Sequence, residues 1–254
     1  MSDGGDIRPP PGWLLALEPR GALEIVGLIA AAPFLAAAPR GQGGPVLVYP
    51  GLGATDRSTA LLRAFLRALG YHAHGWERGR NTRPARADLP EVSERIVALG
   101  RAAGAPVALI GWSRGGLIAR EAARLVPESV RLVITLGTPF AAPGAANVGR
   151  VWRRLTGNPF APPSGDERAR LAAPLPGPSA SIYSRSDGVV AWAACRQIEG
   201  PLRENIEVRG AHLGLGHNPA ALWAIADRLA QPAGVWKPFR APVRAGFWFP
   251  KVNR

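Results

Sequence analysis

Gly111-Trp112-Ser113-Arg114-Gly115 is the stretch that decides the fold of this chain. The apolar residues 106–110 come directly before it, and residues 116–120, which fit a helix, come directly after it. This order predicts a strand, a sharp turn and a helix, with Ser113 in a strained conformation at the turn and its hydroxyl clear of the sheet. A tight turn without chemistry would carry the same pentapeptide. The surrounding pattern favours a nucleophile elbow.

Composition limits the class of protein. The 254 residues are 47% hydrophobic and 19% charged, which indicates a globular chain with one large core. The formal charge of +13 permits anionic partners. The arginines are spread along the chain without zinc-ligand spacing or an RNA-binding signature, so solvated helix faces are favoured and no nucleic acid is expected. Cys195 is the only cysteine, so no internal disulfide can form.

The apolar run from Gly21 to Ala38 resembles the end of a secretory signal. Glu24 and Pro33 interrupt it, and acidic residues precede it where a signal carries basic ones. It is also too short and too broken for a membrane span. We therefore predict one or two helical segments over Trp13–Leu35, packed against the main domain. A cytoplasmic location is expected, with secretion or peripheral membrane association left open.

Beyond Pro45 the chain alternates short apolar runs with longer helical patterns, which is typical of a parallel sheet covered on both faces. Stripes of apolar residues predict helices around positions 61–69, 92–99, 117–125 and 222–229. The fold class is therefore α/β, with a mainly parallel six-stranded sheet. The predicted strands are Val46–Tyr49, Tyr71–Trp76, Val107–Gly111, Arg131–Leu136, Ala180–Ser184 and Asn205–Arg209.

Three parts follow from this pattern: an N-terminal helical extension (1–44), an α/β domain (45–232) and a C-terminal tail (233–254). Within the domain, residues 139–178 break the rhythm with prolines and a cationic stretch. They follow the fourth strand, at the edge where open α/β sheets bind ligands. A small cap over the site and a solvated connection are both open for these residues.

A serine hydroxyl attacks only when a base removes its proton, so the hypothesis requires a histidine and an orienting carboxylate. His212 and His217 follow the sixth predicted strand, in the chain order that an elbow serine requires. Small residues flank His212, which favours it over His217. His72 and His74 precede Ser113 and are expected to be surface or packing residues.

Asp187 lies just beyond the fifth predicted strand, at the edge of the sheet that carries Ser113. The alternative for this Asp-Gly pair is a turn with an Asx hydrogen bond. Position and chain order favour Asp187 as the orienting acid, whereas Asp166, Glu167 and Asp227 fit an insertion or a helix.

Attack on an acyl carbonyl also requires two backbone donors for the oxyanion. The amide of Arg114 directly follows the serine and is one candidate. The loop Tyr49-Pro50-Gly51-Leu52-Gly53 follows the first predicted strand, and its glycines allow the Leu52 amide to turn inward as the second. No metal or organic cofactor is needed.

Taken together, these residues resemble the α/β-hydrolase superfamily, and within it the compact bacterial lipase and esterase type. The resemblance covers roughly residues 45–229, implies hydrolysis of carboxylic esters through an acyl-enzyme, and supports His212 over His217. The chain departs from the usual pattern at Pro50, where such lipases carry His, and at Trp112 and Arg114 beside the serine. Four segments carry the likeness: Pro50–Gly53, Gly111–Gly116, Ile182–Asp187 and His212–Leu215.

The expected reaction is acyl transfer from a small-molecule or lipid ester to water. Acyl transfer to another alcohol or amine, and thioester or amide hydrolysis, need the same residues. A non-catalytic protein that binds a ligand or polyanion is disfavoured by the intact serine, acid and histidine. The tail mixes aromatics and cations in Phe247, Trp248, Phe249, Lys251 and Arg254. It is expected to pack on its own domain, with contact to a lipid surface as the alternative.

Overall fold

The computed structural model describes residues 7–163, 165–242 and 248–250 of the chain. Its centre is one six-stranded sheet in which all five strand pairs are parallel, with the order β2-β1-β3-β4-β5-β6. The predicted fold class is therefore confirmed. The strands are β1 (Pro45–Tyr49), β2 (His72–His74), β3 (Val107–Trp112), β4 (Val130–Leu136), β5 (Ser179–Tyr183) and β6 (Arg203–Glu207).

The strand order explains where a site can form. The chain moves from β1 outward to β2 and then returns to place β3 on the other side of β1. Open α/β sheets bind ligands beyond the carboxyl ends of the strands at such a reversal. The loops after β1 and β3 therefore meet there. They carry Leu52 and Ser113.

The predicted strands differ from the observed ones mainly at the two sheet edges. β2 has three residues rather than six, because it pairs only with Pro45–Leu47 of β1. β6 begins two residues earlier and ends two residues earlier than predicted. In the centre, every residue of β1 and β3 is buried, as expected for parallel strands covered on both faces.

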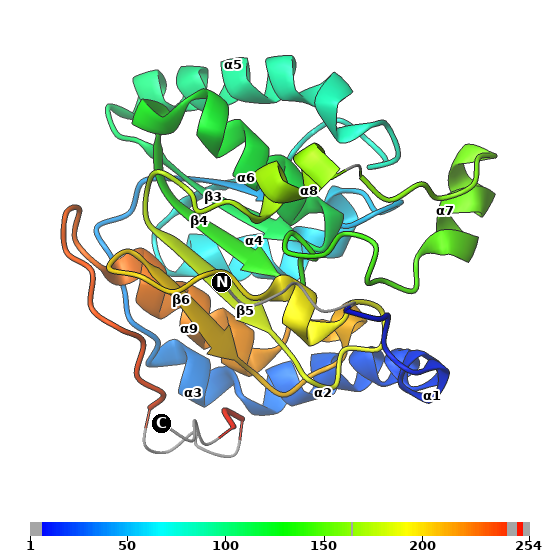
Figure 1. The fold of residues 1–254 in the computed structure, drawn as a ribbon. Helices are drawn as coiled ribbons and strands as arrows, with labels where there is room; N and C mark the ends of the chain where they lie inside the picture. Colours follow the sequence, from blue (N-terminus) through cyan, green and yellow to red (C-terminus); the bar gives the residue numbers. More distant parts are fainter. Residues whose placement is uncertain (1–6, 164, 243–247, 251–254) are drawn as a thin grey trace.

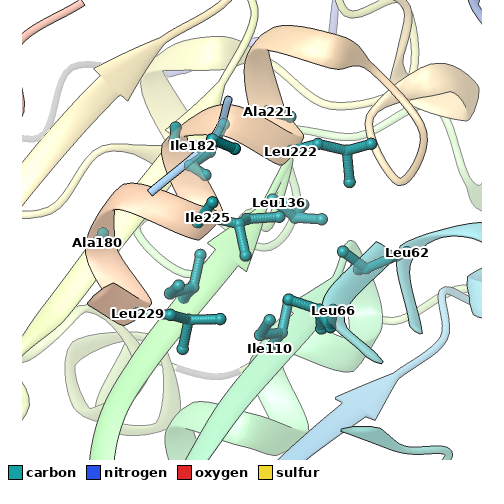
Figure 2. Close-up of a cluster of buried hydrophobic side chains, with 14 of the residues drawn as sticks. Leu62, Leu66, Ile110, Leu136, Ala180, Ile182, Ala221, Leu222, Ile225 and Leu229 are labelled. Atoms are coloured by element: carbon teal, nitrogen blue, oxygen red, sulfur yellow. The ribbon is translucent and has the colours of Figure 1, made fainter. Parts of the chain in front are cut away.

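Helices cover both faces of the sheet (Figure 1). One face carries α5 (Ala85–Ala103) and α6 (Arg114–Leu125). The other carries α4 (Ala60–Ala68) and α9 (Pro219–Ala230), whose side chains meet those of β3, β4 and β5 in the cluster of Figure 2. The α9 helix begins where the Asn218 side chain accepts hydrogen bonds from the backbone of Ala220 and Ala221.

The N-terminal segment, defined here as residues 12–36, forms more and shorter helices than predicted. It contains α1 (Gly12–Ala16), the 3-10 helix η1 (Glu18–Ala22), α2 (Leu23–Ala30) and α3 (Ala32–Ala36). A proline lies in the first turn of both η1 and α3, so each starts a new helix instead of continuing the previous one. Phe34 stacks on Trp223 of α9 with ring centroids 4.1 Å apart. This contact packs the segment against the domain.

Residues 139–178 contain α7 (Gly149–Thr156) and α8 (Gly165–Ala172). In Figure 1 α8 lies close to α6, whereas α7 stands apart from the sheet. Further 3-10 helices are η2 (Asp56–Thr59), η3 (Pro127–Ser129), η4 (Trp192–Cys195) and η5 (His212–Gly214). No helix in the described ranges is long and apolar enough to cross a membrane.

Two aromatic residues of the tail turn toward the domain. Phe249 is buried in the core cluster of α9, and the ring of Trp248 lies 4.8 Å from that of Phe34. The backbone N–H of Arg209 donates to the carbonyl of Trp248 at 3.1 Å. Phe247, Lys251 and Arg254 lie outside the described residues.

Candidate active site

Ser113 occupies the turn between β3 and α6 with φ of 54° and ψ of −123°. Positive φ is costly for a residue with a Cβ, so the neighbouring packing must hold it there. Tight packing around the turn does so. There is no room for a side chain at Gly115, because an added Cβ would lie only 2.5 Å from the carbonyl oxygen of Tyr49. The buried Thr138 hydroxyl also donates to the Ser113 carbonyl at 2.9 Å.

The structure brings Asp187 and His212 together. Asp187 Oδ2 lies 2.6 Å from His212 Nδ1, and both side chains are buried. The other carboxylate oxygen, Oδ1, accepts from the backbone N–H groups of Val189 at 2.8 Å and Val190 at 2.7 Å. The Asx turn considered as an alternative is thus present, and the same side chain also binds the imidazole. The turn fixes the direction of Oδ2.

Electrostatics favour a basic imidazole at this position. Burial lowers the pKa of His212, but the charge and hydrogen bond of Asp187 and the charge of Glu18 raise it, and the pKa ends above its ordinary value. Because Asp187 occupies Nδ1, Nε2 remains as the nitrogen that can take up a proton.

The residues next to Ser113 in space link the elbow to the loop of residues 210–217, which carries His212. The Ser113 N–H donates to the Leu136 carbonyl at 2.7 Å. The next residue, Gly137, packs against the His212 ring, because an added Cβ there would lie 2.9 Å from His212 Nδ1. The Trp112 indole donates to the His212 carbonyl at 3.1 Å. Within the described ranges the Ser113 hydroxyl makes no hydrogen bond of its own. In unliganded enzymes such contacts are often long and tighten when substrate binds.

Leu52 and Arg114, the two candidates for oxyanion donors, line one cavity together with Ser113. Gly51 lies against Ser113, because a Cβ there would be 3.5 Å from that of the serine. The N–H of Leu52, the next residue, has no hydrogen-bond partner in the part of the chain that the structure describes. Arg114 is the first residue of α6, where backbone N–H groups lack intrahelical partners. Both backbone N–H groups can therefore donate hydrogen bonds to an oxyanion that develops at Ser113.

Asn81 holds the loop that carries Leu52, and sequence reasoning missed it. Its side-chain amide donates to the Pro50 carbonyl at 2.7 Å, and its own carbonyl accepts from the Gly53 N–H at 2.8 Å. The Arg114 guanidinium in turn donates to the Asn81 side-chain oxygen. Burial lowers the pKa of Arg114 to about 10, so it is still a cation at neutral pH.

A largely apolar cavity of about 470 Å³ opens at Ser113, Leu52 and Arg114. Residues 139–171 supply much of its wall, including the side chains of Trp152 and Phe160, whose rings lie edge to face at 5.8 Å. The candidate cap therefore shapes the space next to the serine. Such a cavity suits an apolar substrate group.

The alternative residues have other partners, although Glu167 lies on the wall of the same cavity as Ser113. His217 Nε2 binds the backbone carbonyl of Gly21 at 2.9 Å rather than a carboxylate. Glu167 pairs with Arg86 and Arg170 of its surroundings, and Asp227 pairs with Arg228. Cys195 is a buried free thiol, and the described residues contain no cluster of metal-binding side chains.

Comparisons with solved structures identify the fold. Bacillus licheniformis lipase BlEst2 superposes with a TM-score of 0.59 at 14% identity, over 77% of this chain and 95% of the lipase. A monoacylglycerol lipase of Paleococcus ferrophilus gives a TM-score of 0.54 at 16% identity, over 74% and 96%. Aspergillus fumigatus lipase B gives 0.57 at 18% identity, over 75% of this chain and 53% of that protein.

Sequence comparison adds no relative: no protein-family model and no curated protein matches the chain. The structural likeness shows that the chain has the α/β-hydrolase fold, as the sequence resemblance implied. At these identities the fold alone is shown, and the chemistry has to be argued from the site.

Proposed function

We propose that this protein is a serine hydrolase that cleaves carboxylic esters through an acyl-enzyme. The observation that carries the proposal is the 2.6 Å contact between Asp187 and His212, whose backbone carbonyl accepts from the Trp112 side chain, the residue before a serine at positive φ. A carboxylate, an imidazole and a strained serine in this relation are what general-base activation of a hydroxyl requires.

The proposed reaction has two halves. Ser113 Oγ attacks the ester carbonyl carbon while His212 Nε2 takes the hydroxyl proton, and the amides of Leu52 and Arg114 bind the resulting oxyanion. The intermediate collapses when His212 returns the proton to the departing alcohol. Water, deprotonated by His212, then attacks the acyl-enzyme, and the carboxylic acid leaves as Ser113 recovers its proton.

The largely apolar cavity beside Ser113 supports an acyl group without charge as the bound part of the ester. Thioester and amide hydrolysis, or transfer to another acceptor, would use the same groups. A thioesterase domain from a curacin biosynthetic pathway has a comparable likeness, with a TM-score of 0.52 at 14% identity over 75% of this chain and 92% of the domain.

A substrate panel tests the proposal. Chromogenic esters of increasing acyl length, with matched thioesters and anilides, are expected to show fastest turnover for esters. A burst of one chromophore per protein followed by slow turnover would favour an acceptor other than water. Turnover of the thioesters alone, or of none of the panel by folded protein, would contradict ester hydrolysis.

We also propose that the enzyme meets its substrate at a lipid surface. Between residues 9 and 39 the only charged side chains are Glu18, Arg20 and Glu24, and all three bind the loops around the site. The outer face of the segment is therefore apolar, and the formal charge of +13 complements anionic lipid. Its exposed large hydrophobic residues are Trp13, Leu15, Leu17, Leu23, Ile25, Val26 and Ile29.

Sedimentation with phospholipid vesicles tests this contact. The protein is expected to bind vesicles that contain anionic lipid more strongly than neutral ones. Val26→Glu should weaken that binding and leave hydrolysis of a soluble short-chain ester unchanged, because Val26 is exposed. Equal vesicle binding by wild type and Val26→Glu would contradict the lipid contact. So would a dimer of the wild-type protein that dissociates in Val26→Glu.

A further inference from the structure

The N-terminal segment lies against both loops of the candidate site. The acid loop, residues 184–188, follows β5, and the histidine loop, residues 210–217, follows the neighbouring parallel strand β6, so both belong to the α/β domain and leave the same edge of its sheet. Gly188 packs directly on the backbone of Leu14, and a Cβ on Gly21 would lie 2.9 Å from the Gly214 nitrogen. The two loops therefore meet a common partner that precedes the domain in sequence.

One buried carboxylate joins the two loops. Glu18 Oε1 accepts from the Gly188 N–H at 2.7 Å and from the His212 N–H at 3.0 Å, and Oε2 accepts from the Leu213 N–H at 2.9 Å. Gly188 directly follows the candidate acid, and His212 is the candidate base itself. Glu18 is only 3% exposed. A buried carboxylate is costly unless its oxygens are hydrogen-bonded, and here three backbone donors meet that requirement.

A second carboxylate of the segment supports the histidine loop from its other end. Glu24 accepts from the Ala211 N–H at 2.6 Å and from the Asn218 side chain at 2.5 Å. Burial raises the pKa of Glu24, and the hydrogen bonds from Asn218 and Ala211 oppose that rise. The backbone on both sides of His212 is thus held by carboxylates of the N-terminal segment.

We propose that Glu18 is a positioning residue for the Asp187–His212 pair, acting by fixing the backbone of both loops and by placing a second negative charge beside the imidazole. The inference rests on the proposed function, since it assigns Glu18 a part in making His212 an effective base. A single side chain that binds the residue after the acid and the base itself sets the distance between them. Its charge also stabilises the imidazolium that forms during attack.

Several charged or titratable groups lie on the elements packed around the imidazole, and two of them, Asp187 and Glu18, raise its proton affinity. Asp187 binds it directly, and the Glu18 charge adds to the rise in the pKa of His212. The others come from the elements packed around it: Arg20 and Glu24 of the segment, His217 of its own loop, Ser113 of the elbow, and Cys195 beside Asp187. Loss of the Glu18 charge should therefore lower the pKa of His212.

Glu18→Gln is the variant that tests the proposal, because it is isosteric and removes the charge and one acceptor. We expect kcat/KM to fall about 10- to 100-fold, because the variant loses one charge-assisted hydrogen bond and this is the usual effect of such a loss. We also expect the acid limb of the kcat/KM profile to move to lower pH, since His212 must be neutral to accept a proton. Glu128→Gln, an exposed carboxylate in η3, is the matched control and should leave both quantities unchanged.

A second readout does not depend on turnover. The chain has four histidines, so an NMR titration of labelled imidazoles resolves His212, which His212→Ala identifies by the lost signal. The pKa of His212 should be lower in Glu18→Gln than in wild type and intermediate in Glu18→Asp, which keeps the charge on a shorter side chain. If wild type cleaves no ester, the proposed function fails while this titration still tests Glu18.

Equal His212 pKa values in wild type and folded Glu18→Gln would overturn the proposal. So would a fall in kcat/KM without any movement of the pH limb, since that result describes a structural role only. Rates are divided by the concentration of serine that reacts with a phosphonate probe. Unfolded protein, which does not react, therefore does not lower the measured kcat/KM. If the glutamine variant does not fold, Glu18→Asp decides, and wild-type values of pKa and kcat/KM in it would overturn the proposal.

Discussion

Ser113→Ala is expected to lower kcat for ester hydrolysis about 10⁵- to 10⁶-fold, to the level left by oxyanion binding and substrate positioning alone. The change removes only the attacking oxygen. That oxygen has no hydrogen bond within the described part of the chain, and the tight packing of Gly115 against Tyr49 that holds the turn is untouched. The free energy of unfolding should therefore stay within about 0.5 kcal/mol of wild type.

The measurement pairs initial rates on a chromogenic ester with chemical denaturation of each variant. Ser129→Ala is the control: Ser129 precedes β4, at the opposite edge of the sheet from Ser113, and its loss should change neither quantity. A phosphonate probe should label wild type at one residue and leave Ser113→Ala unlabelled. Retained turnover in folded Ser113→Ala, or labelling elsewhere, would show that another group attacks.

The sheet and the elbow could be predicted from sequence because their signals are local. Continuous apolar runs mark strands that are buried on both faces, and the glycines around Ser113 mark a turn in which a strand and a helix nearly touch. Gly70 likewise ends α4 with φ of 94°, in the position a helix-terminal glycine prefers. Where the signal was weaker, at the edge strand β2, the length was predicted wrongly.

Two of the three departures from the lipase pattern, Trp112 and Arg114, make contacts that no local pattern reveals. Trp112 donates its indole N–H to the His212 carbonyl, and Arg114 binds Asn81, which holds the loop of Leu52. Each residue beside the serine thus supports a loop from a distant part of the chain. The sequence separations are 100 and 33 residues, so only the folded chain brings these partners together.

Glu18 illustrates the same limit more strongly. In sequence it is one of the acidic residues that precede the apolar run Gly21–Ala38, where a secretory signal carries basic residues. Its partners Gly188, His212 and Leu213 lie 170 to 195 positions away. A buried carboxylate with three backbone donors leaves no trace in hydrophobic periodicity, because periodicity reports faces of helices and strands rather than pairing between loops.

His212→Ala should lower kcat about as far as Ser113→Ala, roughly 10⁶-fold, because the serine and its base act as one unit. His217→Ala should cost about tenfold at most, the worth of a single hydrogen bond. His217 lies only five positions further along the same loop, so the two variants form a matched pair. It binds the Gly21 carbonyl and meets the edge of the Trp112 ring, and neither contact moves a proton.

The two histidines differ in the group that binds a ring nitrogen, and this difference decides which imidazole can accept a proton. His212 Nδ1 is bound to a carboxylate, which leaves Nε2 with raised basicity and directs it away from Asp187. His217 Nε2 faces a backbone carbonyl, which binds the nitrogen in its protonated form and so removes that nitrogen as an acceptor. Rates of both variants on one soluble ester measure the contrast. A severe loss in His217→Ala with a mild one in His212→Ala would mean that the loop rearranges in the working enzyme and presents the other imidazole to Ser113.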